Sequence, residues 1–416
     1  MRRIAILGYG LEGRSLYSYL KGSGKITILD RNENLKLPRG VKKVLGPRYL
    51  KNLSRFDVIY RSPGVPYYFS EIQKVKAKVA SLSKLFFEVA HRKNATIVGI
   101  TGSVGKTTTA TLLFKMLKSA KKKVFLSGNI GINPLAHIKE LNLRSIVVME
   151  LSSFQLEDLE ASPRIAIVLD IYEEHLDKHN NFREYIAAKS NIVKYQKNSD
   201  IVFYTKDNKY SKKIAKLSRG KKIPISVEAG KKLDYRLKIP GEHNYKNVMA
   251  AAQAALYLGV SEKVIRETIE SFRGIEHRIE FVRNLEGVRY YNNSKATNVA
   301  SAIGALDAFW EKKIVLAGGQ NKNLNLLPLV LRLAKGDVRH AIFFGSLGGE
   351  LARISKKIGF TRFHSVARLR DTIKMAREEA KKGDIVLLSP GAASFDEFRN
   401  YEERGRKFKE WVKKLS

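Results

Sequence analysis

The chain has 416 residues, of which 44% are hydrophobic, so it is long enough to fold into two to four domains with cores of their own. It contains no cysteine, which excludes disulfides, thiolate metal sites and cysteine nucleophiles and leaves oxygen and histidine as metal ligands. Its formal net charge is +37, but the basic residues are scattered pairs and triplets beside apolar segments, which favours a general lysine bias over recognition of a specific nucleic acid.

Apolar runs alternate with helical patterns along most of the chain, which predicts α/β domains built on parallel sheets. The pattern separates into three blocks, and we expect domains at residues 1–93, 94–273 and 274–416. All three are expected to be α/β domains.

The first block begins with a predicted strand at residues 3–7, followed by a turn with Gly8, Gly10 and Gly13. A second predicted strand, at 25–29, is followed directly by Asp30. This spacing is typical of a dinucleotide site, as in an NAD-dependent dehydrogenase. The same turn can hold the pyrophosphate of a sugar nucleotide, and both interpretations remain open at this point.

The second block contains the most informative segment of the chain, Gly-Ile-Thr-Gly-Ser-Val-Gly-Lys-Thr-Thr at residues 99–108, which we call the phosphate loop. It lies between an apolar strand and a helix with a regular apolar face, so backbone N–H groups could cradle nucleotide phosphates. The bland alternative is an ordinary strand-to-helix turn. The residues predicted to bind the phosphates are Gly102, Ser103, Gly105, Lys106, Thr107 and Thr108.

Acidic residues follow the next two predicted strands of this block, at 145–149 and 165–169. Glu150 comes after the first strand, and Asp170 with His175 after the second. Open parallel sheets bind ligands at these carboxyl ends, so Glu150 could hold Mg²⁺ and His175 a second ion. Taken alone, Glu150 could instead cap a helix and His175 could be a surface residue.

The rest of the chain continues the α/β pattern. A lysine-rich stretch at 197–238 is interpreted as a peripheral excursion of the second block. The third block carries predicted strands near 288–291, 313–317, 341–344 and 384–388. No apolar run approaches the length of a membrane span and the first residues lack a secretory signal, so we expect a cytoplasmic protein without membrane insertion.

Motifs in all three blocks together resemble the Mur ligase family, in the family's order and over essentially the whole chain. They are the phosphate loop, Gly128-Asn-Ile-Gly131, Glu150-Leu-Ser-Ser-Phe-Gln-Leu-Glu157, His175-Leu-Asp177, Ala187-Ala-Lys189, Gly241-Glu-His-Asn244 with Asn247, His277-Arg278, Asn293-Ser-Lys-Ala-Thr-Asn298 and Leu388-Ser-Pro-Gly-Ala-Ala-Ser-Phe-Asp396. Within the family, Glu-Leu-Ser-Ser-Phe-Gln and Ser-Lys-Ala-Thr-Asn most resemble the branch that adds D-glutamate to UDP-N-acetylmuramoyl-L-alanine.

The resemblance implies that the first and third domains are Rossmann-like α/β domains and that the central one is a P-loop ATPase-like α/β domain. It also implies an ATP-dependent amide ligase of peptidoglycan precursor synthesis that works through an acyl phosphate. It implies catalytic roles for Lys106, Glu150, His175 and Lys189. It also implies that Thr107, Glu150, His175 and Lys189 are the ligands of two Mg²⁺ ions. Lys189 matches a lysine that the family carbamylates, which would turn an ammonium into an anion that supports a metal. Without the resemblance, Lys189 would be interpreted as a solvated helix lysine.

Further residues match the family's binding positions. For ATP these are Asn244, Asn247, Arg278 and Asn293, although Asn244 alone could be a helix N-cap. For the UDP-linked substrate and the incoming D-glutamate they are Gly10, Arg14, Asp30, Arg31, Ser62, Gly64, Asn129, Ser152, Gln155, Lys295, Thr297, Lys322, Ser394 and Phe395. Ser62 and Gly64 could equally belong to an ordinary turn.

The chain departs from the family's usual residues at Val104, Asp170, Asn293, Asn321 and Tyr401. Because these changes spare the phosphate and metal set, we expect an active, divergent ligase that is a monomer. Two alternatives remain: a Mur-type ligase that uses another amino acid or nucleotide-linked glycan, and a non-catalytic protein that binds nucleic acid.

Overall fold

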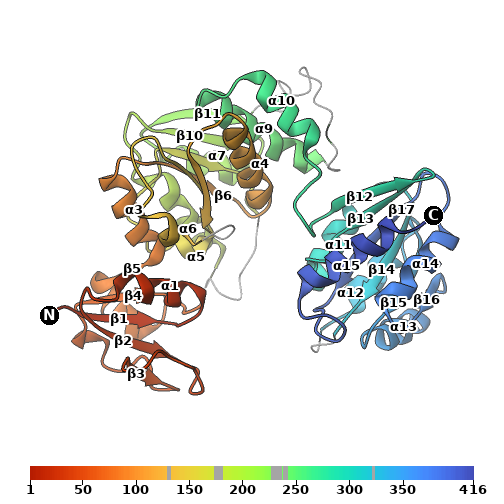
Figure 1. Ribbon diagram of the computed structural model, residues 1–416, viewed down its shortest axis with the longest axis horizontal. Coiled ribbons are helices and arrows are strands. Elements are labelled where there is room, and N and C mark those ends of the chain that lie inside the picture. The colour runs from red at the N-terminus through yellow and green to blue at the C-terminus, as the bar shows by residue number, and fades with distance from the viewer. Residues whose placement is uncertain (129–132, 173–180, 226–236, 238–241, 321–323) are drawn as a thin grey trace. The chain divides into compact units, whose positions relative to one another are not determined.

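The computed structural model describes residues 1–416 except 129–132, 173–180, 226–236, 238–241 and 321–323. The chain divides into two compact units, Met1–Tyr235 with Tyr245–Ile269 and Arg236–Asn244 with Glu270–Ser416. The described strands form three sheets (Figure 1). Each sheet falls within one of the three predicted domain ranges, so the predicted α/β class is confirmed, while the exact domain boundaries stay a prediction.

The first sheet has five parallel strands in the order β3-β2-β1-β4-β5. Its elements are β1 (Arg3–Leu7), α1 (Leu11–Leu20), β2 (Lys25–Asp30), β3 (Lys42–Leu45), η1 (Leu53–Arg55), β4 (Val58–Arg61), α2 (Ser70–Gln73), η2 (Lys76–Lys78) and β5 (Val79–Ser81). The strand order reverses direction beside β1, because β2 lies on one side of it and β4 on the other. In open parallel sheets, ligands bind outside the carboxyl ends of the strands beside such a reversal, which here are β1 and β4.

The second sheet has six parallel strands in the order β11-β10-β9-β6-β8-β7, with β6 at its reversal point. Its elements are β6 (Thr96–Thr101), α4 (Lys106–Ser119), β7 (Val124–Gly128), η3 (Pro134–His137), β8 (Ile146–Glu150), α5 (Ser153–Leu156), β9 (Ile165–Val168), α6 (Phe182–Lys194), β10 (Ile201–Thr205), α7 (Lys209–Ala215), β11 (Lys221–Ile225), α9 (Glu242–Tyr257) and α10 (Glu262–Ser271). The carboxyl ends of β6, β8 and β9 therefore lie together.

The sequence predicts a peripheral excursion at 197–238, but the described part of this stretch belongs to the second sheet. It supplies β10 and β11, which extend the second sheet at its edge. The apolar side chains Ile201, Val202 and Phe203 are buried, whereas the lysines of α7 are exposed. Lysine content hid two short strands whose apolar residues pack inward.

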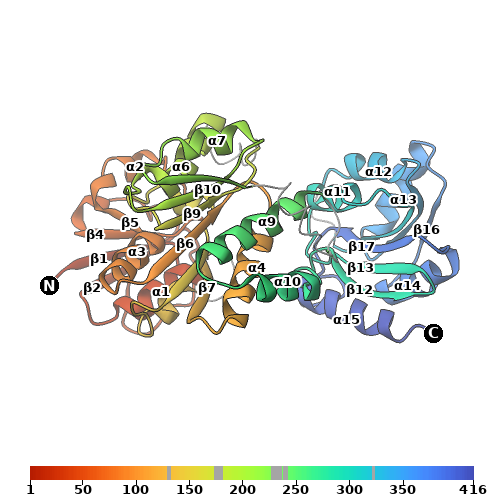
Figure 2. The same ribbon diagram turned by 90° about the horizontal axis from the view of Figure 1, so that it is seen from above.

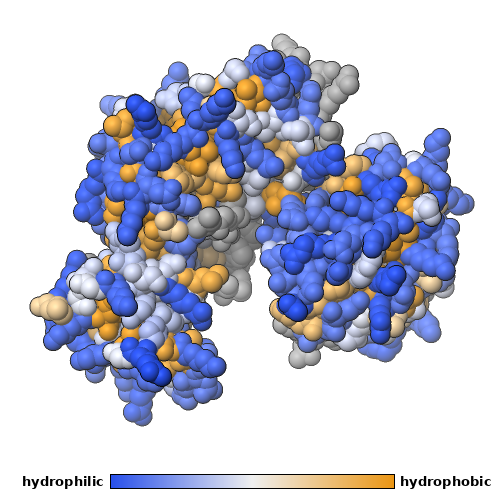
Figure 3. All heavy atoms as spheres, in the orientation of Figure 1, coloured by the Kyte–Doolittle hydropathy of each residue, from blue (hydrophilic) through white to orange (hydrophobic). Residues whose placement is uncertain are grey.

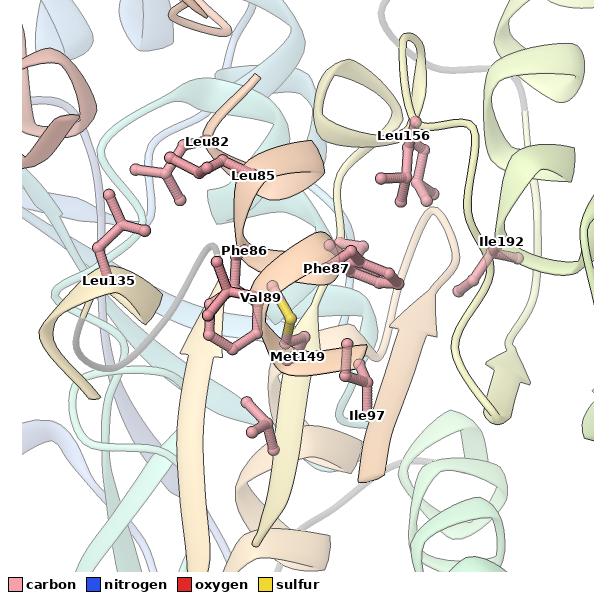
Figure 4. Packing of buried hydrophobic residues seen from close by; sticks show 14 of the residues in the cluster. Leu82, Leu85, Phe86, Phe87, Val89, Ile97, Leu135, Met149, Leu156 and Ile192 are labelled. Carbon is pink, nitrogen blue, oxygen red and sulfur yellow. The ribbon is translucent and has the colours of Figure 1, made fainter. Parts of the chain in front are cut away.

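Helix α3 (Leu82–Arg92) joins the first two sheets through a shared core (Figure 4). Phe86 and Phe87 are fully buried beside Ile97 of β6 and Met149 of β8. Its amino end is capped by Ser81, whose hydroxyl accepts the N–H of Lys84 at 3.1 Å. Each buried phenylalanine contributes roughly 2 to 3 kcal/mol of apolar transfer free energy, so this helix holds the two sheets in one compact unit.

The third sheet has six strands in the order β12-β13-β17-β14-β15-β16, with only the edge strand β12 antiparallel. Its elements are β12 (Glu280–Leu285), β13 (Val288–Asn292), α11 (Val299–Asp307), β14 (Lys313–Gly318), α12 (Leu327–Leu333), β15 (Val338–Phe344), α13 (Gly348–Lys357), β16 (Phe363–Ser365), α14 (Leu369–Glu379), β17 (Ile385–Gly391) and α15 (Tyr401–Lys413). One core packs against α11, α12 and α13 and the other against α14 and α15, so helices cover both faces (Figure 2).

The surface drawn in Figure 3 is mostly hydrophilic, as expected for domains whose apolar residues are buried in the cores. Hydrophilic side chains cover most of the face drawn in Figure 3, with apolar residues scattered among them. Among the described residues, no helix combines the length and apolar character that crossing a membrane requires.

Candidate functional site

The phosphate loop connects β6 to α4 at the reversal point of the second sheet (Figure 1). Gly102 and Gly105 both have positive φ, at 159° and 85°. A Cβ on Gly105 would lie 2.0 Å from Oδ1 of Asn247, which is buried in α9. The glycines therefore allow a close approach that another residue would block, and they leave the amino end of the 14-residue α4 free of side-chain bulk.

The side chain of Lys106 folds back over the phosphate loop. Its Nζ donates to the carbonyl oxygens of Gly102 at 2.8 Å and of Ser103 at 2.9 Å. The ammonium thus lies beside the backbone where α4 begins, at the end of the helix that favours anions. This position suits the predicted contact with the outer phosphates of a nucleotide. Thr107 and Thr108 occupy the first turn of the same helix, and both are largely buried.

Two acidic residues lie at the carboxyl ends of the strands on either side of β6. Glu150 is the last residue of β8 and is 2% exposed, and its register partner in β6 is Ile100. Asp170 follows β9, and its Oδ2 lies 3.6 Å from Nζ of Lys246 and accepts the hydroxyl of Tyr172 at 3.2 Å. Glu150 belongs to the strand itself, so the alternative of a helix-capping glutamate is wrong.

Lys189 is the main finding at this site. It lies on α6, is 1% exposed, and donates from Nζ to the carbonyl oxygen of Gly102 at 3.0 Å and to the hydroxyl of Thr101 at 3.3 Å. Its ammonium is also 4.7 Å from the centre of the Tyr185 ring. The alternative of a solvated helix lysine is therefore wrong. Burying a long cationic side chain is costly, which points to a specific use of this position.

Tyr185, one turn before Lys189, anchors α6 to the phosphate loop. Its hydroxyl is 2.8 Å from the hydroxyl of Ser103. The Ser103 hydroxyl also accepts the N–H of Tyr172 at 2.9 Å, and the Ser103 N–H donates to the carbonyl oxygen of Asp170 at 2.8 Å. Ser103 thus connects the loop to both α6 and the segment after β9. Sequence reasoning missed Tyr185 and Lys246, although the four-residue spacing from Lys189 could have indicated Tyr185.

Helix α9 brings Asn247, one of the two predicted base-contacting asparagines, against the phosphate loop. Asn247 contacts Gly105, and its carbonyl oxygen accepts the hydroxyl of Thr109 at 3.4 Å. Asn244 lies inside α9, which begins at Glu242, so the alternative of a helix N-cap at Asn244 is wrong. Val104, where the family usually has asparagine, is 44% exposed on the loop.

The glycine turn of the first sheet has the predicted geometry. Gly8 has a φ of 88°, and a Cβ on Gly13 would lie 2.1 Å from the Gly8 carbonyl oxygen. Asp30 accepts the N–H of Tyr9 at 2.7 Å, so its carboxylate holds the turn in place. The Ser62 hydroxyl donates to the Gly8 carbonyl oxygen at 2.8 Å. Of the predicted substrate-binding residues at this carboxyl edge, Gly10, Arg14, Arg31 and Gly64 are exposed.

Ser152 and Gln155 have roles in the fold. They form a capping box at the start of α5, where the Gln155 N–H donates to the Ser152 hydroxyl at 3.3 Å and the Ser152 N–H donates to Oε1 of Gln155 at 3.1 Å. Nε2 of Gln155 also donates to Glu12 of α1 at 3.3 Å. These bonds tie the second sheet to the first, and a contact with substrate stays a prediction for both residues.

In the second compact unit, predicted residues gather at the carboxyl ends of β13 and β17. The Asn293 N–H donates to the carbonyl oxygen of Leu388 at 2.8 Å, and its amide donates to the Ser389 hydroxyl at 3.2 Å. Lys295 follows it, with Nζ 5.9 Å from the Tyr401 ring centre. Thr297 and Ser394 belong to the same two segments, and Ser394 is buried, whereas Phe395 is 59% exposed.

Arg404 of α15 holds these two segments together. It is fully buried and donates to the hydroxyl and carbonyl oxygens of Ser294 at 3.0 and 2.8 Å and to the carbonyl oxygens of Ala392 and Ala393 at 3.1 to 3.3 Å. Burial lowers the pKa of Arg404 to about 10. Sequence reasoning missed this residue, because no local pattern links it to a segment 110 positions away.

Arg278 is exposed between two residues with left-handed backbone. His277 has a φ of 65° and Ile279 a φ of 46°, which is a strained conformation for a β-branched residue. The His277 ring is buried, with Nδ1 2.9 Å from Nδ2 of Asn292. Strain of this kind is often kept at functional positions, which supports a role for Arg278. Three other predicted site residues, Asn129, His175 and Lys322, lie outside the described residues.

Comparisons with known proteins agree with this geometry. Residues 100–255 match the Mur ligase middle domain, and residues 277–391 match the glutamate ligase domain of Mur ligases. The whole chain is 36% identical to the UDP-N-acetylmuramoylalanine–D-glutamate ligase of Acetivibrio thermocellus, of which the alignment covers 97%. It is 34% identical to the ligase of that name from Symbiobacterium thermophilum, of which 98% is covered.

Solved structures show the same fold. MurF from Thermotoga maritima in complex with ADP has a TM-score of 0.59 and 18% identity, covering 100% of this chain and 96% of that one. MurC from the same organism has a TM-score of 0.57 and 17% identity, with 99% of each chain covered. These structures bear on the fold alone, whereas the curated relatives are similar in sequence from end to end. The resemblance is thus confirmed: the chain belongs to the Mur ligase family.

Proposed function

We propose that this protein is an ATP-dependent amide ligase that adds D-glutamate to UDP-N-acetylmuramoyl-L-alanine in peptidoglycan precursor synthesis. The observation that carries the choice of substrates is the sequence similarity to UDP-N-acetylmuramoylalanine–D-glutamate ligases over the full length of this chain. The buried lysine beside the phosphate loop supports a catalytic centre at the second sheet. We also propose that the enzyme acts as a monomer in the cytoplasm.

In the proposed reaction, the substrate carboxylate attacks the γ-phosphorus of ATP and ADP leaves. The resulting acyl phosphate is attacked at its carbonyl carbon by the amino group of D-glutamate, and phosphate leaves as the amide forms. The backbone N–H groups where α4 begins would bind phosphate oxygens. Lys106 would neutralise charge on the outer phosphates while the phosphoryl group is transferred.

The donor set at the phosphate loop fits Mg²⁺. Thr107 offers a hydroxyl and Glu150 a carboxylate, both largely buried, and oxygen ligands of this kind are the ones that magnesium prefers. A bound Mg²⁺ would supply positive charge to the phosphates during transfer. Glu150 and Thr107 would hold it, with His175 as a further candidate ligand.

We further propose that Lys189 is carbamylated in the active enzyme. The Lys189 ammonium would first lose a proton, and the resulting amine would attack the carbon of carbon dioxide. The N–C bond forms as one C=O π bond breaks, and loss of a second proton from nitrogen leaves an anionic carbamate at Nζ. Such an anion could support a metal ion, whereas an unmodified ammonium would repel one. The Nζ of Lys189 is already within 3.3 Å of Thr101 and Gly102, at the start of the phosphate loop.

In the first sheet, the exposed edge with Gly10, Arg14, Arg31 and Gly64 would receive the UDP part of the substrate. In the third, Lys295, Thr297, Ser394 and Phe395, with Lys322, would bind the D-glutamate carboxylates. Asn247, Asn244, Arg278 and Asn293 are proposed to contact ATP. Asn293 differs from the usual acid, and its amide already bonds Ser389, so we expect a weaker contact with the ribose.

Phosphate release tests the proposal. The purified protein is given ATP, Mg²⁺ and UDP-N-acetylmuramoyl-L-alanine, with D-glutamate or with a panel of other amino acids. Release that depends on D-glutamate supports the proposal. Release with a different amino acid or nucleotide-linked glycan would replace its substrates but keep the ligase chemistry, and salt-sensitive binding of nucleic acid without any turnover would overturn it.

A further inference from the structure

Two histidines and a glutamate meet on the third sheet. His340 is the third residue of β15, His364 is the middle residue of β16, and Glu379 is the last residue of α14. His340 lies toward the amino end of its strand. The proposed D-glutamate residues gather at the carboxyl ends of the strands, so this cluster is separate from them.

The register of β15 and β16 explains why His340 and His364 lie close together. Ile342 of β15 pairs with His364 of β16, and His340, two residues before Ile342, projects from the same face. That face packs against α14 through Ile342 and Ala376. Glu379 follows Ala376 by three residues and therefore lies above the same face of the sheet.

The side chains are close enough to share an ion. Nδ1 of His340 is 3.2 Å from Oε2 of Glu379, and Nε2 of His364 is 3.2 Å from Oε1 of Glu379. The two imidazole rings stack with centroids 4.8 Å apart. One ligand atom from each residue lies within 4.8 Å of the others. Ligands of a tetrahedral Zn²⁺ at about 2.1 Å are separated by about 3.4 Å, so small side-chain rotations suffice.

The charges around the cluster allow a cation. Arg339 and Arg362 are two basic side chains that act electrostatically on His340. Arg339 is neutralised by Asp384, with Nε and Oδ2 2.6 Å apart, and Arg362 donates to the carbonyl oxygen of Ala334 at 3.1 Å.

We propose that His340, His364 and Glu379 bind one divalent ion of the zinc class and that this ion ties the edge strand β16 to α14. Two imidazoles and a carboxylate suit Zn²⁺, Co²⁺ or Ni²⁺, whereas Mg²⁺ prefers oxygen ligands alone. The side chains are 23%, 39% and 33% exposed, so water could complete the coordination. The site is structural and independent of the ligase reaction.

The test is equilibrium binding of Zn²⁺ to the full-length, metal-free protein in excess Mg²⁺, which occupies oxygen-rich sites. We expect His364→Gln and Glu379→Gln each to bind one equivalent of Zn²⁺ fewer than the unmodified protein, or to bind that equivalent at least tenfold more weakly. The matched control is His91→Gln, which changes an exposed histidine outside the cluster and should leave binding intact. Unchanged Zn²⁺ binding in both cluster variants, or no binding by the unmodified protein, would overturn the proposal.

Two further measurements distinguish loss of the metal site from misfolding of a variant. Co²⁺ in place of Zn²⁺ should give the visible absorption of a four- or five-coordinate ion in the unmodified protein and lose it in His364→Gln. Zn²⁺ should also raise the unfolding temperature of the unmodified protein but not that of His364→Gln, because an ion that binds only the folded state stabilises it. An equal rise in both proteins would contradict a structural ion at this cluster.

Discussion

The ammonium of Lys189 lies 3.0 Å from the carbonyl oxygen of Gly102, although the two residues belong to different elements 87 positions apart. This contact places a buried lysine against the loop that is proposed to bind the phosphates of ATP. Tyr185 holds the same helix to Ser103 of that loop. The position of Lys189 is therefore fixed by packing and hydrogen bonding on two sides.

Loss of Lys189 should abolish ligation. We expect Lys189→Ala to lower kcat at least 10³-fold, because the metal support at the phosphate loop disappears. Short carboxylates such as formate or acetate should restore part of the activity if the missing group is a carbamate. The matched control, Lys194→Ala, changes an exposed lysine on the same helix and should retain normal turnover. Full activity of Lys189→Ala would refute this role.

Lys106→Ala should also abolish ligation, through a different defect. We expect weaker ATP binding and a kcat at least 10²-fold lower, because a cation that neutralises the phosphates is removed. Short carboxylates should have no effect on this variant. The measurement is phosphate release at saturating ATP, and rescue by carboxylates would argue against the separate roles of the two lysines.

The phosphate loop should tolerate no side chain at Gly105. A Cβ there would approach Oδ1 of Asn247 to 2.0 Å at a φ of 85°, so Gly105→Ala should weaken ATP binding at least tenfold and destabilise the protein by roughly 1 to 3 kcal/mol. Gly304→Ala serves as the control, since a Cβ at Gly304 meets nothing within 4 Å. Isothermal titration with an ATP analogue measures the effect, and equal affinities in the two variants would contradict the tight approach.

Glu157 should make stability depend on pH. Burial raises the pKa of Glu157 from 4.5 to about 7, with Arg61 opposing the shift, so the folded state holds this proton more tightly than the unfolded state. The stabilisation is complete below about pH 4.5 and is lost as the pH rises through about 7. We expect roughly 1 to 2 kcal/mol, since partial exposure screens the full shift.

Glu157→Gln should remove this dependence. Its unfolding temperature should change less between pH 5 and pH 8 than that of the unmodified protein. The exposed Glu160→Gln is the control and should keep the original dependence, because Glu160 is 69% exposed. A Glu157→Gln profile that follows the unmodified protein would show that another group carries the effect.

We expect Arg404 to hold the segments of the proposed D-glutamate site in place. Arg404→Lys cannot make the forked contacts to Ser294, Ala392 and Ala393, so we expect a loss of roughly 3 kcal/mol in stability and a higher KM for D-glutamate. Arg406→Lys, at an exposed position of the same helix, is the control. An unchanged KM in folded Arg404→Lys would limit Arg404 to a purely structural role.

The parts of the fold that sequence could predict are those with a local signal. The apolar strand before the phosphate loop, its glycines and the acid at the end of β8 follow from pattern and spacing alone. The two strands at 201–205 and 221–225 lack a clear sequence signal because each is only five residues long and both lie in a lysine-rich stretch. The many lysines of this stretch obscure the weak apolar pattern of the two strands.

The site was predicted less completely, because its parts meet only in the folded chain. Composition and spacing indicate no role for Lys189, and in the sequence only the family resemblance singles it out, because its burial arises in the folded chain. Arg404 and the bonds from Ser103 to Tyr185 have no local signature, because each partner is distant in sequence. The capping box of Ser152 and Gln155 has the opposite character, since its spacing is visible in the sequence but its contact with Glu12 is not.

The most direct measurement follows oxygen through the reaction. UDP-N-acetylmuramoyl-L-alanine labelled with ¹⁸O in its carboxylate is incubated with the protein, ATP, Mg²⁺ and D-glutamate, and the products are weighed by mass spectrometry. The account predicts a glutamyl product that requires D-glutamate and a released phosphate that carries one labelled oxygen from the carboxylate. No glutamyl product, or a product accompanied by unlabelled phosphate, would contradict it.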